Sequence, residues 1–74
     1  MTLDELKPGR ECRVIRVTAE GIVGQRLLDM GFSPGTEIKV VRNAPLMDPV
    51  DVKLRGFILA LRHSEARGVE VNLL

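Results

Sequence analysis

One stretch of the 74-residue chain alternates so regularly that it limits the folds the chain can form. Val50, Val52 and Leu54 are separated by charged residues, which is the period-two pattern of a strand with one buried face. Gly56 then permits a turn, and residues 57–62 are apolar on both faces, which is typical of a strand in a central or closed position. A hairpin of this kind needs further strands to cover its apolar faces.

Three more segments have strand character. Residues 10–17 are rich in β-branched side chains, but their alternation slips between Val14 and Ile15, which indicates a bulge or burial on both sides. Residues 36–42 and 69–73 alternate cleanly, the first after a Ser-Pro-Gly turn and the second after a glycine. The chain therefore predicts five short strands.

Between the first two strands the spacing becomes helical. Val23, Leu27 and Met30 fall close to one face of residues 21–30, and Gly31 suits the left-handed residue that ends a helix. Shorter helical turns are expected at residues 2–6 and 64–67.

The segment 43–49 contains two prolines, Pro45 and Pro49, which cannot donate to a strand ladder. We therefore expect a projecting loop here, with Leu46 and Met47 at an unusually apolar tip.

These elements predict a mostly β fold, a small barrel of about five strands with one short α-helix inserted between the first and second strands. Closure into a barrel removes the adhesive edges that an open sheet with two apolar faces would leave. A chain of 74 residues has room for one core, so we expect a single domain over residues 1–74.

Composition and charge narrow the classes of function. Eleven basic against ten acidic residues give a net charge of +1, too weak a field to favour nucleic acid, and the lack of Trp and Tyr argues against binding proline-rich peptides. Cys12 is the only cysteine, which suits a reducing cytoplasm. No apolar run reaches membrane-spanning length, so we expect a cytoplasmic protein without direct membrane insertion.

Three blocks of the sequence together resemble the FeoA family of ferrous iron transport proteins. They are residues 26–36 (RLLDMGFSPGT), residues 43–49 (NAPLMDP) and residues 54–62, where LRG is followed by LALR. The resemblance implies an SH3-like barrel in the cytoplasm and a non-catalytic accessory or regulatory role, exercised by docking to FeoB, the large membrane GTPase transporter of ferrous iron. The chain departs from the family pattern at Met47, where a glycine is usual and where a side chain disfavours a positive φ.

Reactive chemistry finds little support in the residues. The weak candidates for a metal site are His63 and Glu65, because the chain has one His and one Cys and no paired ligand spacing. No glycine-rich stretch matches a phosphate-binding loop, so we expect neither a cofactor nor enzymatic activity. The alternative is a metal-sensing or repressor-associated SH3-like module that binds a divalent metal, similar to the domains that metal-dependent repressors carry.

The remaining class of function is protein binding, through apolar side chains that are not buried in the core. Leu28 lies about 100° around the helix from the core-facing leucine before it, and Leu46 and Met47 are held between prolines. We expect these three residues to form one contact surface for the transporter, with Arg26 and Asp29 at its rim. Self-association into a homo-oligomer is the rival use of the same patch.

Overall fold

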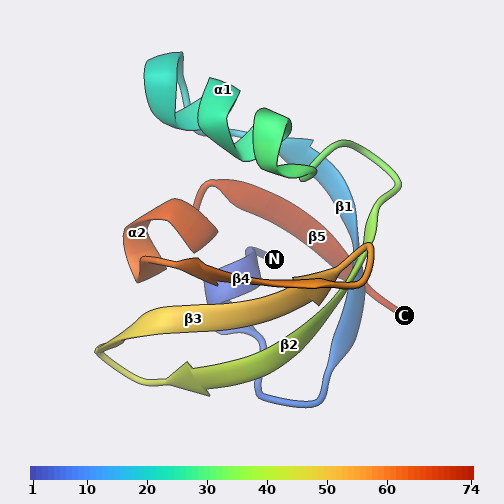
Figure 1. Cartoon of the computed structure of the whole chain (residues 1–74), viewed down its shortest axis with the longest axis vertical. Coiled ribbons are helices and arrows are strands. Elements are labelled where there is room, and N and C mark those ends of the chain that lie inside the picture. Colours follow the sequence, from blue (N-terminus) through green and yellow to red (C-terminus); the bar gives the residue numbers. More distant parts are fainter.

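The computed structural model describes all residues, 1–74, and contains one five-stranded antiparallel sheet that curls around the core (Figure 1). In chain order the elements are η1 (Leu3–Glu5), β1 (Glu11–Val17), α1 (Gly21–Met30), β2 (Glu37–Ala44), β3 (Met47–Leu54), β4 (Phe57–Leu61), α2 (His63–Ala66) and β5 (Val69–Leu73). The predicted mostly β fold, with its helix between the first and second strands, is confirmed.

The strands are ordered β4-β3-β2-β1-β5, so β4 and β5 form the two edges of the curled sheet. The chain passes from β4 to β5 through α2, and β5 pairs with β1 rather than with β4. Figure 1 shows α1 above one end of the sheet and the β2–β3 hairpin projecting near the other end. The barrel is therefore partly open along β4.

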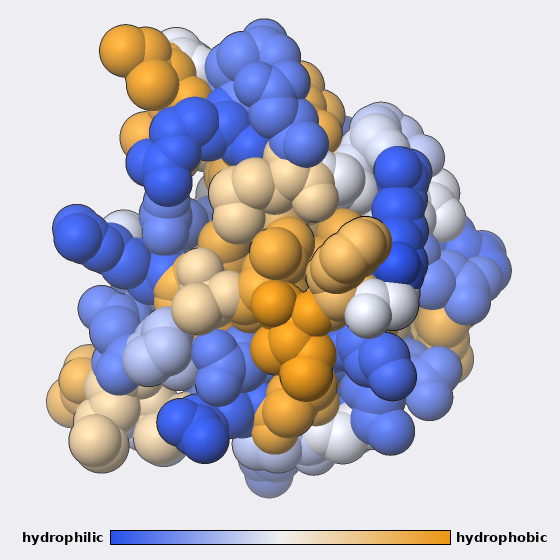
Figure 2. Space-filling view, in the orientation of Figure 1, coloured by the Kyte–Doolittle hydropathy of each residue, from blue (hydrophilic) through white to orange (hydrophobic).

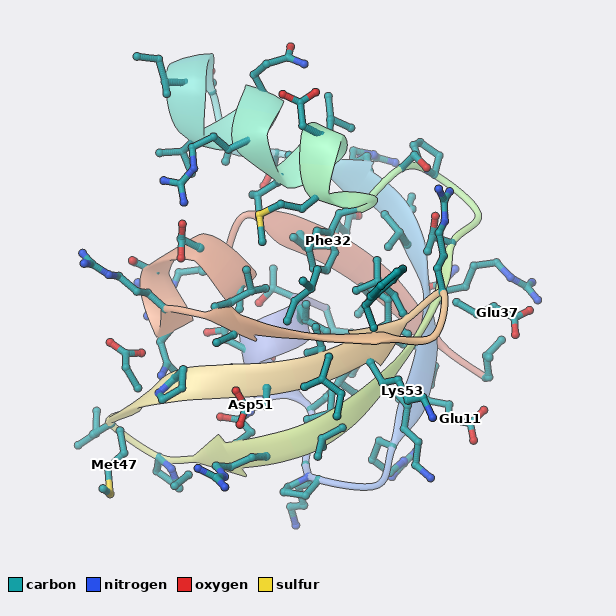
Figure 3. The ribbon with its side chains drawn as sticks, viewed as in Figure 1. Glu11, Phe32, Glu37, Met47, Asp51 and Lys53 are labelled. Carbon is teal, nitrogen blue, oxygen red and sulfur yellow. The ribbon has the colours of Figure 1, made fainter.

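Apolar side chains fill the inside of the curl. Val50, Val52 and Leu54 are all buried, which confirms the alternation predicted for β3. Phe32 comes two residues after the end of α1, points between the helix and the sheet (Figure 3), and is the largest of the fully buried side chains. The helix thus covers one end of the core.

Local signals placed several features correctly. Gly31 ends α1 with a φ of 112°, and its N–H is directed at the carbonyls of Leu27 and Leu28. The register of β1 against β5 shifts between Val14 and Arg16, where the alternation of the sequence slips.

The segment 43–49 differs from its prediction as a loop. The turn contains only Pro45 and Leu46, because β2 and β3 continue on either side of it. Pro49 lies within β3, in the part of the strand where its register against β2 shifts. A bulge leaves residues without ladder bonds, so the missing N–H of Pro49 does not end the strand.

The strand predicted at residues 57–62, which the structure forms as β4 (Phe57–Leu61), was expected in a central or closed position, and this was wrong. β4 is an edge strand, and Phe57 and Ile58 remain exposed on it. The apolar character of both faces therefore reflects exposed apolar surface as well as burial.

Candidate functional site

The tip of the β2–β3 hairpin carries the most exposed apolar side chain of the protein. Pro45 precedes Leu46, which has a positive φ of 60°, the combination found in type II turns. Leu46 is 100% exposed and Met47 is 65% exposed, and Met47 lies at the projecting tip in Figure 3. The positive φ falls on Leu46 rather than on Met47, so the side chain at the family's usual glycine position causes no backbone strain.

A polar network ties the base of this hairpin to the rest of the chain. The ring of His63 contacts Oδ1 of Asp48 through Nδ1, at 2.8 Å, and Oδ1 of Asn43 through Nε2, at 2.9 Å. The amide nitrogen of Asn43 donates to the carbonyls of Asp4 and Leu6, at 2.9 and 2.7 Å. Because those two bonds fix the orientation of the amide, its oxygen faces His63, and all the bonds form when both ring nitrogens carry a proton.

The same contacts stabilise the charged form of the Asp48 carboxylate. It accepts a hydrogen bond of 2.7 Å from the backbone N–H of His63 as well as the bond from the ring. These bonds, the backbone one first, lower the pKa of the Asp48 carboxyl below its ordinary value. The negative form of Asp48 is therefore the one that holds α2 against the hairpin.

The weak metal candidates do not converge. Glu65 accepts from the backbone N–H of Arg62 at 2.9 Å and lies 3.6 Å from the guanidinium of Arg26, while His63 points toward the hairpin. A metal ion at His63 would have to displace one of the two ring partners. No group of three or more His, Cys, Asp or Glu side chains is placed to hold a metal ion.

The sequence-predicted residues on α1 lie away from the hairpin tip. Leu28 is 42% exposed, Arg26 pairs with α2 through Glu65, and Asp29 accepts a hydrogen bond from Gln25 on its own helix. Figure 1 places α1 and the hairpin tip toward opposite ends of the long axis. The structure thus confirms that all three apolar candidates are exposed but does not bring Leu28 together with the tip.

Sequence reasoning missed other exposed apolar residues. Ile22 is exposed on α1, and so is Val23, which was expected on the core-facing side with Leu27 and Met30. Phe57 and Ile58 are exposed on β4. The signal was present in the run of apolar residues at 57–61, but it was interpreted as burial.

Two further findings concern the reactivity of Cys12 and the character of the helices. Cys12 is buried in the core, and burial raises the pKa of its thiol to about 11, so the thiolate that reacts or binds metal is disfavoured. Neither α1 nor α2 has the length and apolar character needed to cross a bilayer.

We expect the substitution Asn43→Ala to lower the free energy of unfolding by about 2–3 kcal/mol, because it leaves two backbone carbonyls and one ring nitrogen without a partner. Urea denaturation followed by circular dichroism measures the loss. The matched control is Arg42→Ala on the same strand, which removes an ion pair between the exposed guanidinium of Arg42 and the partly buried carboxylate of Asp51 and should cost about 1 kcal/mol or less. Equal losses in the two variants would show that the network does not hold the hairpin.

The curled five-stranded sheet, with a helix after its first strand and an exposed apolar hairpin tip, defines a small SH3-like domain. The chain matches the FeoA domain family over residues 1–73, and it belongs to the FeoA family.

Individual relatives agree with this assignment. A fusion of Fe(2+) transport protein A with the Fe(2+) transporter FeoB from Porphyromonas gingivalis is 39% identical over 74 residues, and this chain spans only 9% of its length. The solution structure of a FeoA protein from Chlorobium tepidum has a TM-score of 0.88 and 44% identity, covering 100% of this chain and 70% of that one.

A third relative links the family to the SH3 fold. The crystal structure of FeoA from Stenotrophomonas maltophilia, complexed with zinc and described as a prokaryotic SH3 domain protein, has a TM-score of 0.88 and 34% identity over 97% of this chain and 89% of that one. A manganese-dependent transcriptional repressor contains a similar fold, with a TM-score of 0.89 at 17% identity over 41% of its chain. That last likeness concerns the fold alone.

Proposed function

We propose that this chain is a non-catalytic cytoplasmic accessory protein of bacterial ferrous iron uptake, which acts by docking onto the membrane GTPase transporter FeoB. The observation that carries the proposal is Leu46, fully exposed at a positive φ on the projecting hairpin. A leucine in that conformation costs roughly 1 kcal/mol relative to glycine and makes no compensating burial within the chain. A contact with a partner gives such a residue a use.

The fusion from Porphyromonas gingivalis supports FeoB as the partner. In that protein a segment 39% identical to this chain is joined covalently to the transporter. Two proteins that occur fused in one organism are candidates for association when they are separate chains. Arg26, Leu28 and Asp29 on α1 remain candidates for a second, separate contact with the transporter.

The alternative function, a metal-sensing or repressor-associated module, has less support. The repressor likeness is at 17% identity, and the ring nitrogens of His63 already face Asp48 and Asn43. The exposed hairpin tip therefore supports docking to a partner better than His63 supports metal binding.

We expect Leu46→Glu combined with Met47→Glu to weaken binding to detergent-solubilised FeoB at least about tenfold, because the change places two charges in an apolar contact. Leu46→Gly should also weaken binding, while it raises the free energy of unfolding by about 1 kcal/mol through relief of the positive φ. Biolayer interferometry measures the affinity, and urea denaturation measures the stability.

The matched control is Leu74→Glu, because Leu74 is also an exposed apolar residue but lies at the C-terminus, away from the hairpin tip in Figure 1. It should leave the affinity unchanged. If the double variant and Leu46→Gly both bind like the unsubstituted protein, the hairpin tip is not the docking surface; if the unsubstituted protein does not bind FeoB at all, the partner is wrong.

A further inference from the structure

The outer edge of β4 has backbone groups without partners. β4 pairs with β3 in five consecutive positions, from Leu54 opposite Phe57 to Val50 opposite Leu61. A two-residue turn is flanked by a hydrogen-bonded pair, and such pairs alternate along an antiparallel ladder. The N–H and C=O groups of Ile58 and Ala60 therefore point away from β3, and no hydrogen bond to them occurs elsewhere in the chain.

The other edge of the sheet, β5, is covered by the N-terminal residues. The N–H of Val71 on β5 donates to the carbonyl of Met1 at 2.9 Å, and Thr2 forms a bridge with Glu70. The N-terminal residues therefore cover β5. β4 lacks the usual edge protection, since residues 57–61 contain no proline and no charge and their register has no bulge.

Apolar side chains lie along the same unprotected strand. Phe57 is 70% exposed and Ile58 is 63% exposed, on opposite faces of β4, and Leu59, on the same face as Phe57, is half-buried. Figure 2 shows an orange band on the face that carries β4, bordered on both sides by polar residues. An added strand would therefore gain apolar contacts on both of its faces as well as hydrogen bonds.

Unpaired positive charges stand at the two ends of β4. Arg55 in the preceding turn has one side-chain hydrogen bond, to the hydroxyl of Ser33 at 3.5 Å. Arg62 after the strand forms no ion pair, although its charge contributes to lowering the pKa of Asp48. A small pocket borders the Arg62 end, and its lining residues are Val23, Arg26, Arg62, Ser64 and Glu65. A ligand with a carboxylate at each end would match both arginines.

The charges also decide between two occupants. If a second copy paired its β4 antiparallel to this one, Arg55 of each copy would approach the Arg62 end of the other, and like charges would repel. An extended segment of a different protein, apolar in its middle and acidic at its ends, meets the opposite charge instead.

We propose that the outer edge of β4 binds an extended, acid-flanked apolar segment of a partner protein as an added strand, with hydrogen bonds to the backbones of Ile58 and Ala60. The segment would be about five residues long, since a strand of five residues spans roughly 17 Å. The site goes beyond the proposed docking of the hairpin tip and uses different residues, so either can be wrong without the other.

The test uses isotope-labelled protein and a synthetic peptide in which valine and threonine alternate between two terminal glutamates. Nuclear magnetic resonance titration should shift the amide signals of Ile58 and Ala60 and slow their hydrogen exchange. A control peptide with lysine in place of both glutamates should bind at least about tenfold more weakly. Equal binding of the two peptides, or shifts confined to other elements, would overturn the proposal.

Two variants of the protein test the contributions of the β4 backbone and of the two arginines. Ala60→Pro removes an N–H that points outward, a position where edge strands tolerate proline, so the fold should persist while affinity falls about tenfold. The double substitution Arg55→Glu and Arg62→Glu should reverse the preference toward the lysine peptide. If Ala60→Pro folds and binds normally, or if sedimentation shows a dimer of the unsubstituted protein that Ala60→Pro dissociates, the proposed ligand is wrong.

Discussion

Substituting Gly24 by alanine is expected to destabilise the protein by at least about 3 kcal/mol, although the same change inside most helices stabilises by about 1 kcal/mol. A Cβ atom on Gly24 would lie 2.1 Å from the carbonyl oxygen of Ala19 and 2.9 Å from its carbonyl carbon. Both are backbone atoms, so the contact is relieved only if α1 moves away from the segment that joins it to β1. Urea denaturation with a circular dichroism signal measures the effect.

The neighbouring substitution Gln25→Ala is the matched control. Gln25 is exposed on the same helix, and its side chain forms one hydrogen bond, to Asp29, so its replacement should change stability by less than about 0.5 kcal/mol. If Gly24→Ala were as stable as this control, the close approach of α1 to Ala19 would not be what positions the helix. The position of α1 also determines where Leu28, a proposed contact residue, lies, and the helix covers the core above Phe32.

Much of the fold follows from local patterns in the sequence. Gly31 ends α1 because a left-handed residue needs little side chain, and the alternation in β3 places its valines inside because one face of the strand is buried. These features depend on a few adjacent residues, so the sequence alone predicts them. The bulge at Val14 belongs to the same group, since the slip in alternation marks it directly.

Other features depend on which segments become neighbours, and these were not predicted. The apolar residues of β4 indicate a strand but not its place in the sheet, so an edge strand was taken for a central one. Pro49 excludes a ladder bond at its own nitrogen, but a bulge in the pairing with β2 makes that bond unnecessary. In both cases the local property of the residues was recognised, but the segments that pack beside them were not.

The candidate site was likewise predicted only in part. The exposure of Leu28, Leu46 and Met47 was expected from their local surroundings and is observed, whereas their grouping into one surface required knowledge of where α1 and the hairpin lie. The partners of His63 are 15 and 20 residues away in the chain, and no periodicity joins them. Prediction therefore reached single exposed residues but not the arrangement between elements.

Replacing Phe32 by alanine should cost about 3–5 kcal/mol, the largest single effect we expect, because the side chain is 0% exposed and its loss leaves a cavity between α1 and the sheet. A domain of this size has roughly 4–11 kcal/mol of stability in total. The variant should therefore unfold at much lower urea concentration, with a thermal midpoint lowered in proportion.

Phe57→Ala provides a control that makes the same chemical change at the other phenylalanine. Phe57 is 70% exposed on β4, so its truncation should cost less than about 1 kcal/mol. The same variant should also bind the acid-flanked peptide more weakly, because Phe57 lies on the edge strand β4. A large loss of stability in Phe57→Ala would mean that this ring serves the core, whereas a small loss together with weaker peptide binding assigns the two phenylalanines to folding and to recognition respectively.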